Sequence, residues 1–220
     1  MATSPQSKER PILFSAPMVR AILEGRKTVT RRAIKVQPRI DASGNFCVGS
    51  SNYGQDGYGK PVTKHFINGC CPYGKPGDRL WVRETWARVG NSDPGYLTFG
   101  ATYPDCLPPD LENIPAASEI RWKPSIHMFR RDSRILLEIT DVRVERLQDI
   151  SEAQAIAEGV EPFTDFQPTG HWRRYRDGGM NSYVANAVAS YASLWTEING
   201  AGAWEANPWV WVVEFKQVTP

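Results

Sequence analysis

The sequence predicts an α+β fold, in which a small mixed β-barrel carries flanking helices and long inserted loops. Three observations support it. Apolar runs of strand length outnumber helical patterns, their spacing is irregular, and no internal repeat is present. With 41% hydrophobic and 23% charged residues, the composition is that of a globular protein. We expect a single domain over residues 11–218, after a polar N-terminal tail at residues 1–10.

The first elements expected are a strand, a helix and a second strand. Residues 12–14 form a short apolar run typical of a strand. A helix should follow, with Ser15 at its N-cap, Pro17 in its first turn and Gly25 at its C-terminal end. Residues 79–86 predict another strand, entered through a proline-glycine turn.

The C-terminal half predicts two further strands and two helices. Residues 134–146 show the apolar pattern of a long strand. Residues 151–159 begin with a capping-box pattern and end at a glycine, which predicts a short helix. Apolar residues repeat at three and four over residues 181–199, which predicts a longer helix. Residues 209–215 are almost wholly apolar, as in a strand buried on both faces.

Three long stretches lie between these elements, near residues 36–73, 90–124 and 162–180. Each is rich in Gly, Pro, Asn, Asp or Ser, which is the chemistry of loops. Structureless loops of this length in a compact domain are usually functional or disordered. We therefore interpret them as insertions within one domain.

Charge and cysteine content narrow the function classes. The net charge of +2 excludes a polycation that coats nucleic acid, so any nucleic-acid contact must use a local patch. No apolar run is long enough to span a membrane and residues 1–10 lack a signal-peptide core, which predicts a cytoplasmic protein without membrane contact. The four cysteines form no C-x-x-C pair, so we expect reduced thiols and no metal site.

Residues 25–32 hold the most informative combination of side chains, with Lys27 three positions before Thr30. A threonine hydroxyl becomes a nucleophile beside a base, and burial can make a lysine amine basic. Positions three apart in a regular strand face opposite ways, so the two side chains converge only through a turn or bulge. The alternative is that Lys27, Arg31 and Arg32 are solvated charges after a helix end.

The pattern Gly25-x-Lys27-x-x-Thr30-x-Arg32 resembles the motif of the ASCH domain, a β-barrel family related to PUA RNA-binding domains. Residues 76–82 resemble the glycine-aspartate turn and the strand after it, and residues 210–215 resemble its closing strand. The resemblance covers the scaffold but not the three insertions. Over most of its length the chain is also similar to longer ASCH-type proteins of phage and prophage sequences.

The resemblance implies an amidohydrolase that removes an acyl group from N4 of acylated cytidine or cytosine, without metal or organic cofactor. Small bacterial members use a lysine, a threonine and a glutamate, which correspond to Lys27, Thr30 and Glu158. A small shift in the alignment would select Glu152 or Glu161 instead, and by helical periodicity alone Glu158 is a surface residue. Arg31 and Arg32 are then candidates for binding the nucleoside or nucleobase substrate.

Residues 171–176 alternate cations with aromatic rings, which suits phosphate contact and base stacking. We therefore add Trp172 and Arg173 to the substrate-binding candidates, with a mobile basic loop as the alternative. Arg130 and Arg131 beside His127 would extend a basic rim. These features also support a non-catalytic reader of RNA, single-stranded or modified nucleic acid. A ribonuclease is a third alternative, weakened by a content of only three histidines.

Overall fold

The computed structural model describes residues 7–90, 93–164, 170–176 and 183–219. Residue contacts divide the chain into two compact units. Unit 1 comprises Met1–Gly25, Gly77–Ile139 and Lys216–Pro220, and unit 2 comprises Arg26–Pro76 and Thr140–Phe215. Each unit mixes strands and helices, which confirms the α+β class. In the part of the chain that is described, no helix is both long enough and apolar enough to cross a membrane.

Unit 1 is built on strands β1 (Glu9–Leu13) and β6 (Arg79–Arg83), which pair in parallel. Strand β6 also pairs antiparallel with the start of β9 (Leu136–Arg146). The expected strand over residues 79–86 is in fact two strands, because β7 (Trp86–Val89) leaves β6 and forms a hairpin with β8 (Tyr96–Phe99). The expected polar tail is shorter than residues 1–10, since β1 already starts at Glu9; residues 1–6 lie outside the described part.

Helix α1 (Ala16–Leu23) follows β1 as predicted. Ser15 occupies its N-cap position without a side-chain hydrogen bond, and the helix buries Val19 and Ile22. Gly25 follows the helix with a φ of 73°. This left-handed conformation suits glycine and strains residues with a Cβ atom.

Substituting Gly25→Ala is expected to lower the free energy of unfolding by about 1 kcal/mol, because alanine is strained at positive φ. An added Cβ would meet no atom within 4 Å, so the backbone conformation alone causes the loss. Urea unfolding measures it. Gly69→Ala is the matched control, since that helical glycine also has open space around it and should gain stability. Equal effects of the two substitutions would contradict the assignment.

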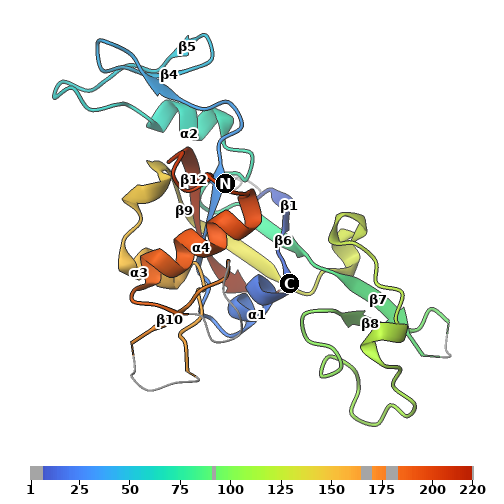
Figure 1. Cartoon of the computed structure of the whole chain (residues 1–220). Helices are drawn as coiled ribbons and strands as arrows, with labels where there is room; N and C mark the ends of the chain where they lie inside the picture. The colour runs from blue at the N-terminus through green and yellow to red at the C-terminus, as the bar shows by residue number, and fades with distance from the viewer. Residues whose placement is uncertain (1–6, 91–92, 165–169, 177–182, 220) are drawn as a thin grey trace, which may run out of the picture. The chain divides into compact units, whose positions relative to one another are not determined.

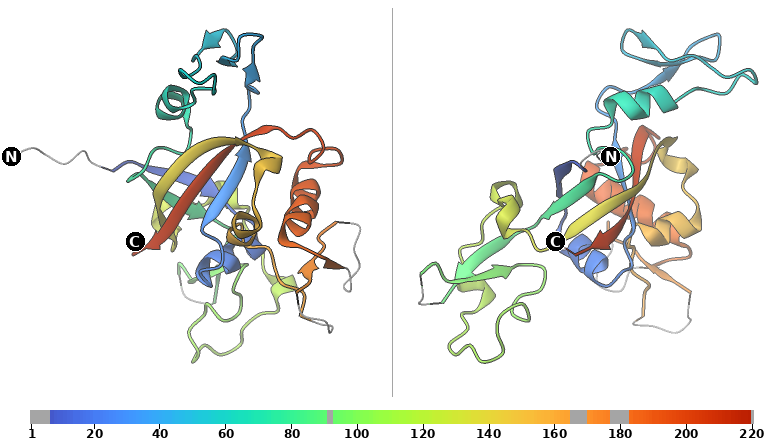
Figure 2. Two further views of the ribbon diagram at one scale, coloured as in Figure 1. Left: turned by 90° about the vertical axis from the view of Figure 1, so that its left-hand side faces the viewer. Right: turned by 180° about the vertical axis from the view of Figure 1, so that it is seen from behind.

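Unit 2 contains β2 (Val29–Ala33), which pairs antiparallel with β12 (Trp209–Val218). Figure 2 shows β9, β12 and β2 side by side. Two helices, α3 (Glu152–Ala157) and α4 (Ala187–Asn199), contact each other and lie together in Figure 1. Apolar residues of β2, β12 and both helices form the core of the unit.

The prediction for α3 is confirmed in detail, but the longer helix starts later than expected. Ser151 and Gln154 form the predicted capping box of α3. Helix α4 starts only at Ala187, because the Asn186 side chain caps it by accepting a hydrogen bond from the Ala189 amide at 2.7 Å. Of the earlier part, Tyr183–Val184 is strand β11, paired with β10 (Trp172–Arg173), and residues 181–182 lie outside the described part.

The insertion at residues 36–73 is not the loop that the sequence predicts. It holds a three-stranded sheet and a helix: β3 (Arg39–Ile40), β4 (Phe46–Val48), β5 (Ser51–Asn52) and α2 (Lys64–Cys70). The Phe66 ring of α2 stacks on Trp211 of β12, with centroids 4.9 Å apart. In the insertion at residues 162–180, positions 165–169 and 177–180 lie outside the described part.

The main sheet has the strand order β1-β6-β9-β12-β2. Strands β1 and β2 stand at the two ends of this order. Within the described residues the pairing is therefore open, and the closed barrel that the sequence predicts is not found. Strands β9 and β12 continue from one unit into the other, so no single point in the sequence separates the units.

Candidate active site

Lys27 lies in unit 2, two residues before β2, where the main chain touches the end of α3. It forms an isolated antiparallel bridge with Glu158, and the Thr28 amide donates to the Ala157 carbonyl at 2.9 Å. Glu158 is the C-cap residue of α3, held there by backbone hydrogen bonds. The backbone therefore brings together two residues that are 131 positions apart.

The amine of Lys27 is almost completely enclosed. Nζ donates to Glu158 Oε2 at 2.7 Å and to the main-chain oxygens of Glu158 and Val29, both at 2.8 Å. The Val29 carbonyl belongs to the peptide bond that joins Val29 to Thr30. The side chains of Lys27 and Glu158 are only 1% and 4% exposed. The alternative interpretation of Lys27 as a solvated charge is therefore wrong, as is that of Glu158 as a surface residue.

Arg31 completes a buried ion cluster. Its guanidinium donates to Glu158 Oε1 at 3.3 Å, to Gln154 Oε1 at 3.0 Å and to Glu145 Oε2 at 3.3 Å. The side chain is fully buried, so Arg31 is not a solvated charge either. Arg31, predicted to bind substrate, therefore uses these donors within unit 2 and holds the Glu158 carboxylate in place.

The structure distinguishes Glu158 from Glu152 and Glu161, the other two candidates for the carboxylate partner of Lys27. Glu152 caps α4 instead, by accepting from the amides of Ala187 and Val188 at 2.8 and 3.2 Å. Glu161 forms an ion pair with Arg173. Glu158 is the glutamate of the three whose carboxylate contacts Lys27.

Burial lowers the pKa of Lys27, because a charged amine is costly to remove from water. The Glu158 carboxylate opposes this shift, while the charges of Arg32 and Arg31 reinforce it. A lysine of lowered pKa can exchange a proton near neutral pH, but the three oxygens around Lys27 Nζ are all acceptors, so in this arrangement the amine acts as a donor.

Tyr191 of α4 joins this site, although its spacing predicts only a core position in the helix. Burial raises its pKa well above the usual value, and the charge of Glu158 and a hydrogen bond to it act in the same direction. Gln154 and Glu145 were likewise not predicted as site residues. One signal was available for Tyr191, since a phenol in a buried helix stripe requires a hydrogen-bond partner.

Thr30 lies in the regular part of β2, opposite Val213 of β12, and is buried. Alternate strand residues face opposite sides, so Thr30 shares a face with Arg32 and not with Arg31. In the described structure Thr30 is not a member of the hydrogen-bonded cluster of Lys27, Arg31 and Glu158. Strand β2 is regular and holds no turn that would bring the two side chains together. The Lys27 amine donates to the carbonyl of the peptide bond before Thr30.

Arg32 is half-buried, and its positive charge is felt by Lys27, Tyr191 and Tyr73. Burial raises the pKa of Tyr73, and Arg32 acts against that rise. Arg32 is thus the cation on the Thr30 face of β2.

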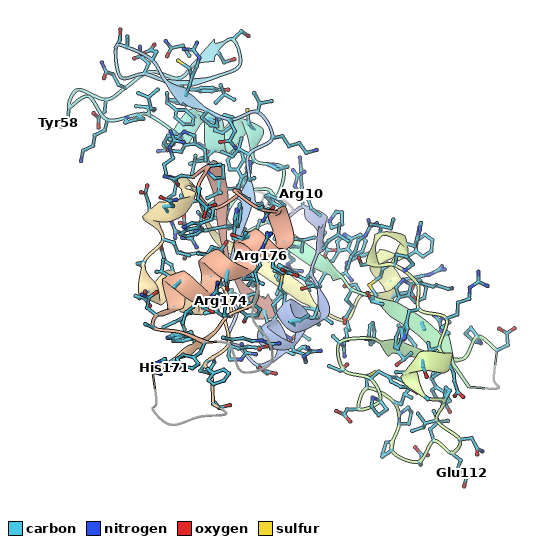
Figure 3. The ribbon with its side chains drawn as sticks, viewed as in Figure 1. Arg10, Tyr58, Glu112, His171, Arg174 and Arg176 are labelled. Carbon is cyan, nitrogen blue, oxygen red and sulfur yellow. The ribbon has the colours of Figure 1, made fainter. Side chains whose placement is uncertain are left out.

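The basic segment, residues 171–176, packs on α4. The Ser190 hydroxyl donates to the Arg173 carbonyl at 2.6 Å, and Arg176 donates to the Thr196 carbonyl at 3.1 Å. Figure 3 labels Arg176, which this hydrogen bond to Thr196 places beside the helix. Trp172 packs against the core of unit 2, whereas the Arg173 side chain is 55% exposed. The mobile-loop interpretation does not fit these described residues, because hydrogen bonds hold them to α4.

Among the described residues, no group of three or more His, Cys, Asp or Glu side chains is placed to hold a metal ion. Comparisons of the chain with protein-family models, curated proteins and solved structures find no match.

Proposed function

We propose that the protein is an amidohydrolase that removes the acyl group from the N4 amide of acylated cytidine or cytosine, or of a similar modified nucleobase. The buried contact of 2.7 Å between Lys27 Nζ and Glu158 Oε2 carries the proposal. The resemblance to the ASCH domain assigns these two residues to one catalytic group. Enzymes tune the pKa of catalytic residues by burial and neighbouring charge, as happens at Lys27.

The proposed reaction requires the Lys27 amine to leave its contacts with Glu158 and Val29 and to turn toward Thr30. Neutral Lys27 then takes a proton from the nucleophile, which is either the Thr30 hydroxyl or a water molecule that Thr30 positions. The nucleophile adds to the acyl carbonyl, and Arg32 stabilises the negative charge on its oxygen. The C–N4 bond then breaks, and the nitrogen leaves as the amino group of cytidine with a proton returned by Lys27. If Thr30 attacks, water hydrolyses the acyl-threonine in a second step. Both routes yield cytidine and a carboxylic acid.

Incubation of the purified protein with N4-acetylcytidine tests the proposal. We expect loss of the ultraviolet band of the acetylated base, with release of cytidine and acetate in equal amounts. Since the proposed residues need no metal, the rate should be unchanged after treatment with EDTA. A burst of cytidine equal to the enzyme concentration would identify the acyl-threonine route. No turnover of any N4-acylated nucleoside, nucleotide or base would contradict the proposal.

The exposed Arg173 on an anchored segment favours a second candidate function, a non-catalytic reader of RNA or modified nucleic acid. Its guanidinium lies over the Tyr175 ring at 5.3 Å from the centroid. Such a reader would bind oligonucleotides with strong salt dependence and return them unchanged. A ribonuclease would instead shorten them, so gel analysis of the recovered oligonucleotide separates the two.

A further inference from the structure

We propose that unit 1 contains a second ligand site, a pocket that binds one nucleotide through its phosphate and its base. The pocket has a volume of about 320 Å³, and all of its lining residues belong to unit 1. Sites for small molecules have volumes of roughly 300–1,000 Å³. The proposal does not depend on the amidohydrolase reaction, because the residues of that reaction belong to unit 2.

The pocket is preformed by main-chain pairing. Trp86 and Lys123 exchange two backbone hydrogen bonds, of 3.2 and 2.7 Å. Both residues line the pocket, and so does Met128. Trp86 and Met128 also form a buried cluster with Phe99. This packing fixes the wall of the pocket before any ligand arrives, which lowers the entropic cost of binding.

Two of the residues that line the pocket are cations, Lys123 and Arg83. Lys123 Nζ lies 4.6 Å from the centre of the Trp86 ring, and the Arg83 guanidinium lies 4.7 Å from the centre of the Trp81 ring. Neither cation has an ion-pair partner in the described ranges of the chain. Glu84, next to Arg83 in sequence, is already held by Arg134 through hydrogen bonds of 2.9 and 3.0 Å. The pocket therefore favours an anion.

Two of the lining residues also carry a buried side-chain donor. Arg83 Nε and Trp86 Nε1 are buried and have no hydrogen-bond partner among the residues that the structure describes. Native proteins leave few buried donors unsatisfied. Both donors belong to residues of the same pocket. Because solvent does not reach either atom, a phosphate accepts from them only after the two side chains shift toward the pocket.

The rim offers a surface for a flat base. The Phe129 side chain lines the pocket and yet is 61% exposed, which is unusual for a phenylalanine. The Arg131 guanidinium lies 5.3 Å from the centre of its ring. This is the basic rim predicted around His127, although Arg130 is engaged by Glu9 at 2.6 Å. An exposed ring that lines the same pocket as Lys123 fits a base stacked on Phe129 with its phosphate at Lys123.

The chemistry fits two sources, a free mononucleotide and one unit of a single-stranded nucleic acid. We would titrate the full chain with adenosine 5′-monophosphate by calorimetry, because the reaction proposed for unit 2 acts on cytosine. A fluorescent oligoadenylate of about eight nucleotides, followed by anisotropy, tests the polymer. Saturable binding of the mononucleotide identifies the first source, and binding of the oligonucleotide alone identifies the second.

Substitutions at exposed positions then locate the site. Phe129→Ala should weaken binding roughly 5- to 150-fold by loss of stacking, without changing its salt dependence. Lys123→Gln should weaken binding and reduce the slope of log affinity against log salt for the oligonucleotide by about 1. Unchanged unfolding transitions should accompany both substitutions, because both side chains are exposed.

Arg121→Gln is the matched control, since Arg121 is an exposed cation two positions before Lys123 that does not line the pocket. It should leave mononucleotide affinity unchanged. An equal loss of affinity in Arg121→Gln and Lys123→Gln would overturn the proposal by showing general charge attraction. Absence of binding, or inorganic phosphate competing as well as the mononucleotide, would overturn it too.

Discussion

Replacing Glu158 with alanine is expected to lower the free energy of unfolding by about 3–5 kcal/mol. The substitution removes the carboxylate that accepts from Lys27 at 2.7 Å and from Arg31 at 3.3 Å, and both cations are buried. Uncompensated charges in a protein interior cost far more free energy than a surface ion pair contributes. Equilibrium unfolding in urea, followed by tryptophan fluorescence, measures the loss.

Two variants make this result specific. Glu152→Ala removes a glutamate from the same helix, but one that caps α4 at an exposed position, so the expected loss is only about 1 kcal/mol. The double variant Lys27→Met/Glu158→Leu removes one charge of each sign, and it should be more stable than Glu158→Ala. An equal loss of unfolding free energy in Glu158→Ala and Glu152→Ala would contradict the prediction, because the buried cluster would then contribute no more to stability than a helix cap.

The second large effect concerns activity on N4-acetylcytidine. Lys27→Arg should reduce kcat/KM by roughly 10²–10⁴-fold, because arginine keeps the positive charge but does not lose its proton. In the wild type, burial lowers the pKa of Lys27 from its usual 10.5. Since the neutral amine accepts the proton, kcat/KM should rise with pH through that lowered pKa, in a limb that lies below pH 10.5. The pH profiles of both proteins between pH 5 and about 10 measure it.

Lys35→Arg is the matched control, because Lys35 is exposed and belongs to the same unit. Its profile should superimpose on that of the wild type. Thr30→Ser should retain most of the activity and Thr30→Val should lose it, since only serine keeps the hydroxyl. Wild-type activity in Thr30→Val would remove Thr30 from the reaction and leave water as the nucleophile.

Local signals in the sequence were sufficient for α3 and insufficient for α2. The capping box of Ser151 and Gln154 lies within one helical turn, and so it can be read directly from residue spacing. Helix α2 has no such signal. It is stabilised by packing between Phe66 and Trp211, which are far apart in sequence. Propensity and periodicity do not report contacts of that kind.

In the candidate site, too, local sequence patterns predicted some features and missed those that depend on contacts between distant residues. The sequence placed Lys27 and Glu158 together only through the resemblance, because the spacing of Glu158 on α3 predicts a solvent position. The bridge to Lys27 overrides that spacing by burying the carboxylate. The role of Gln154 depends on how α3 packs on β2, and that of Tyr191 depends on how α3 and α4 pack. No local pattern encodes either contact.

Helix α3 is only six residues long, and β2 and the residues before it hold both of its ends. Gln154, near its start, accepts from Arg31, and Glu158, at its end, accepts from Lys27. A helix of this length has little stability of its own. The amides of α3 and β2 should therefore exchange with deuterium at a common rate, as one cooperative unit. Any motion that exposes the Lys27 amine then also breaks the contacts that stabilise the helix.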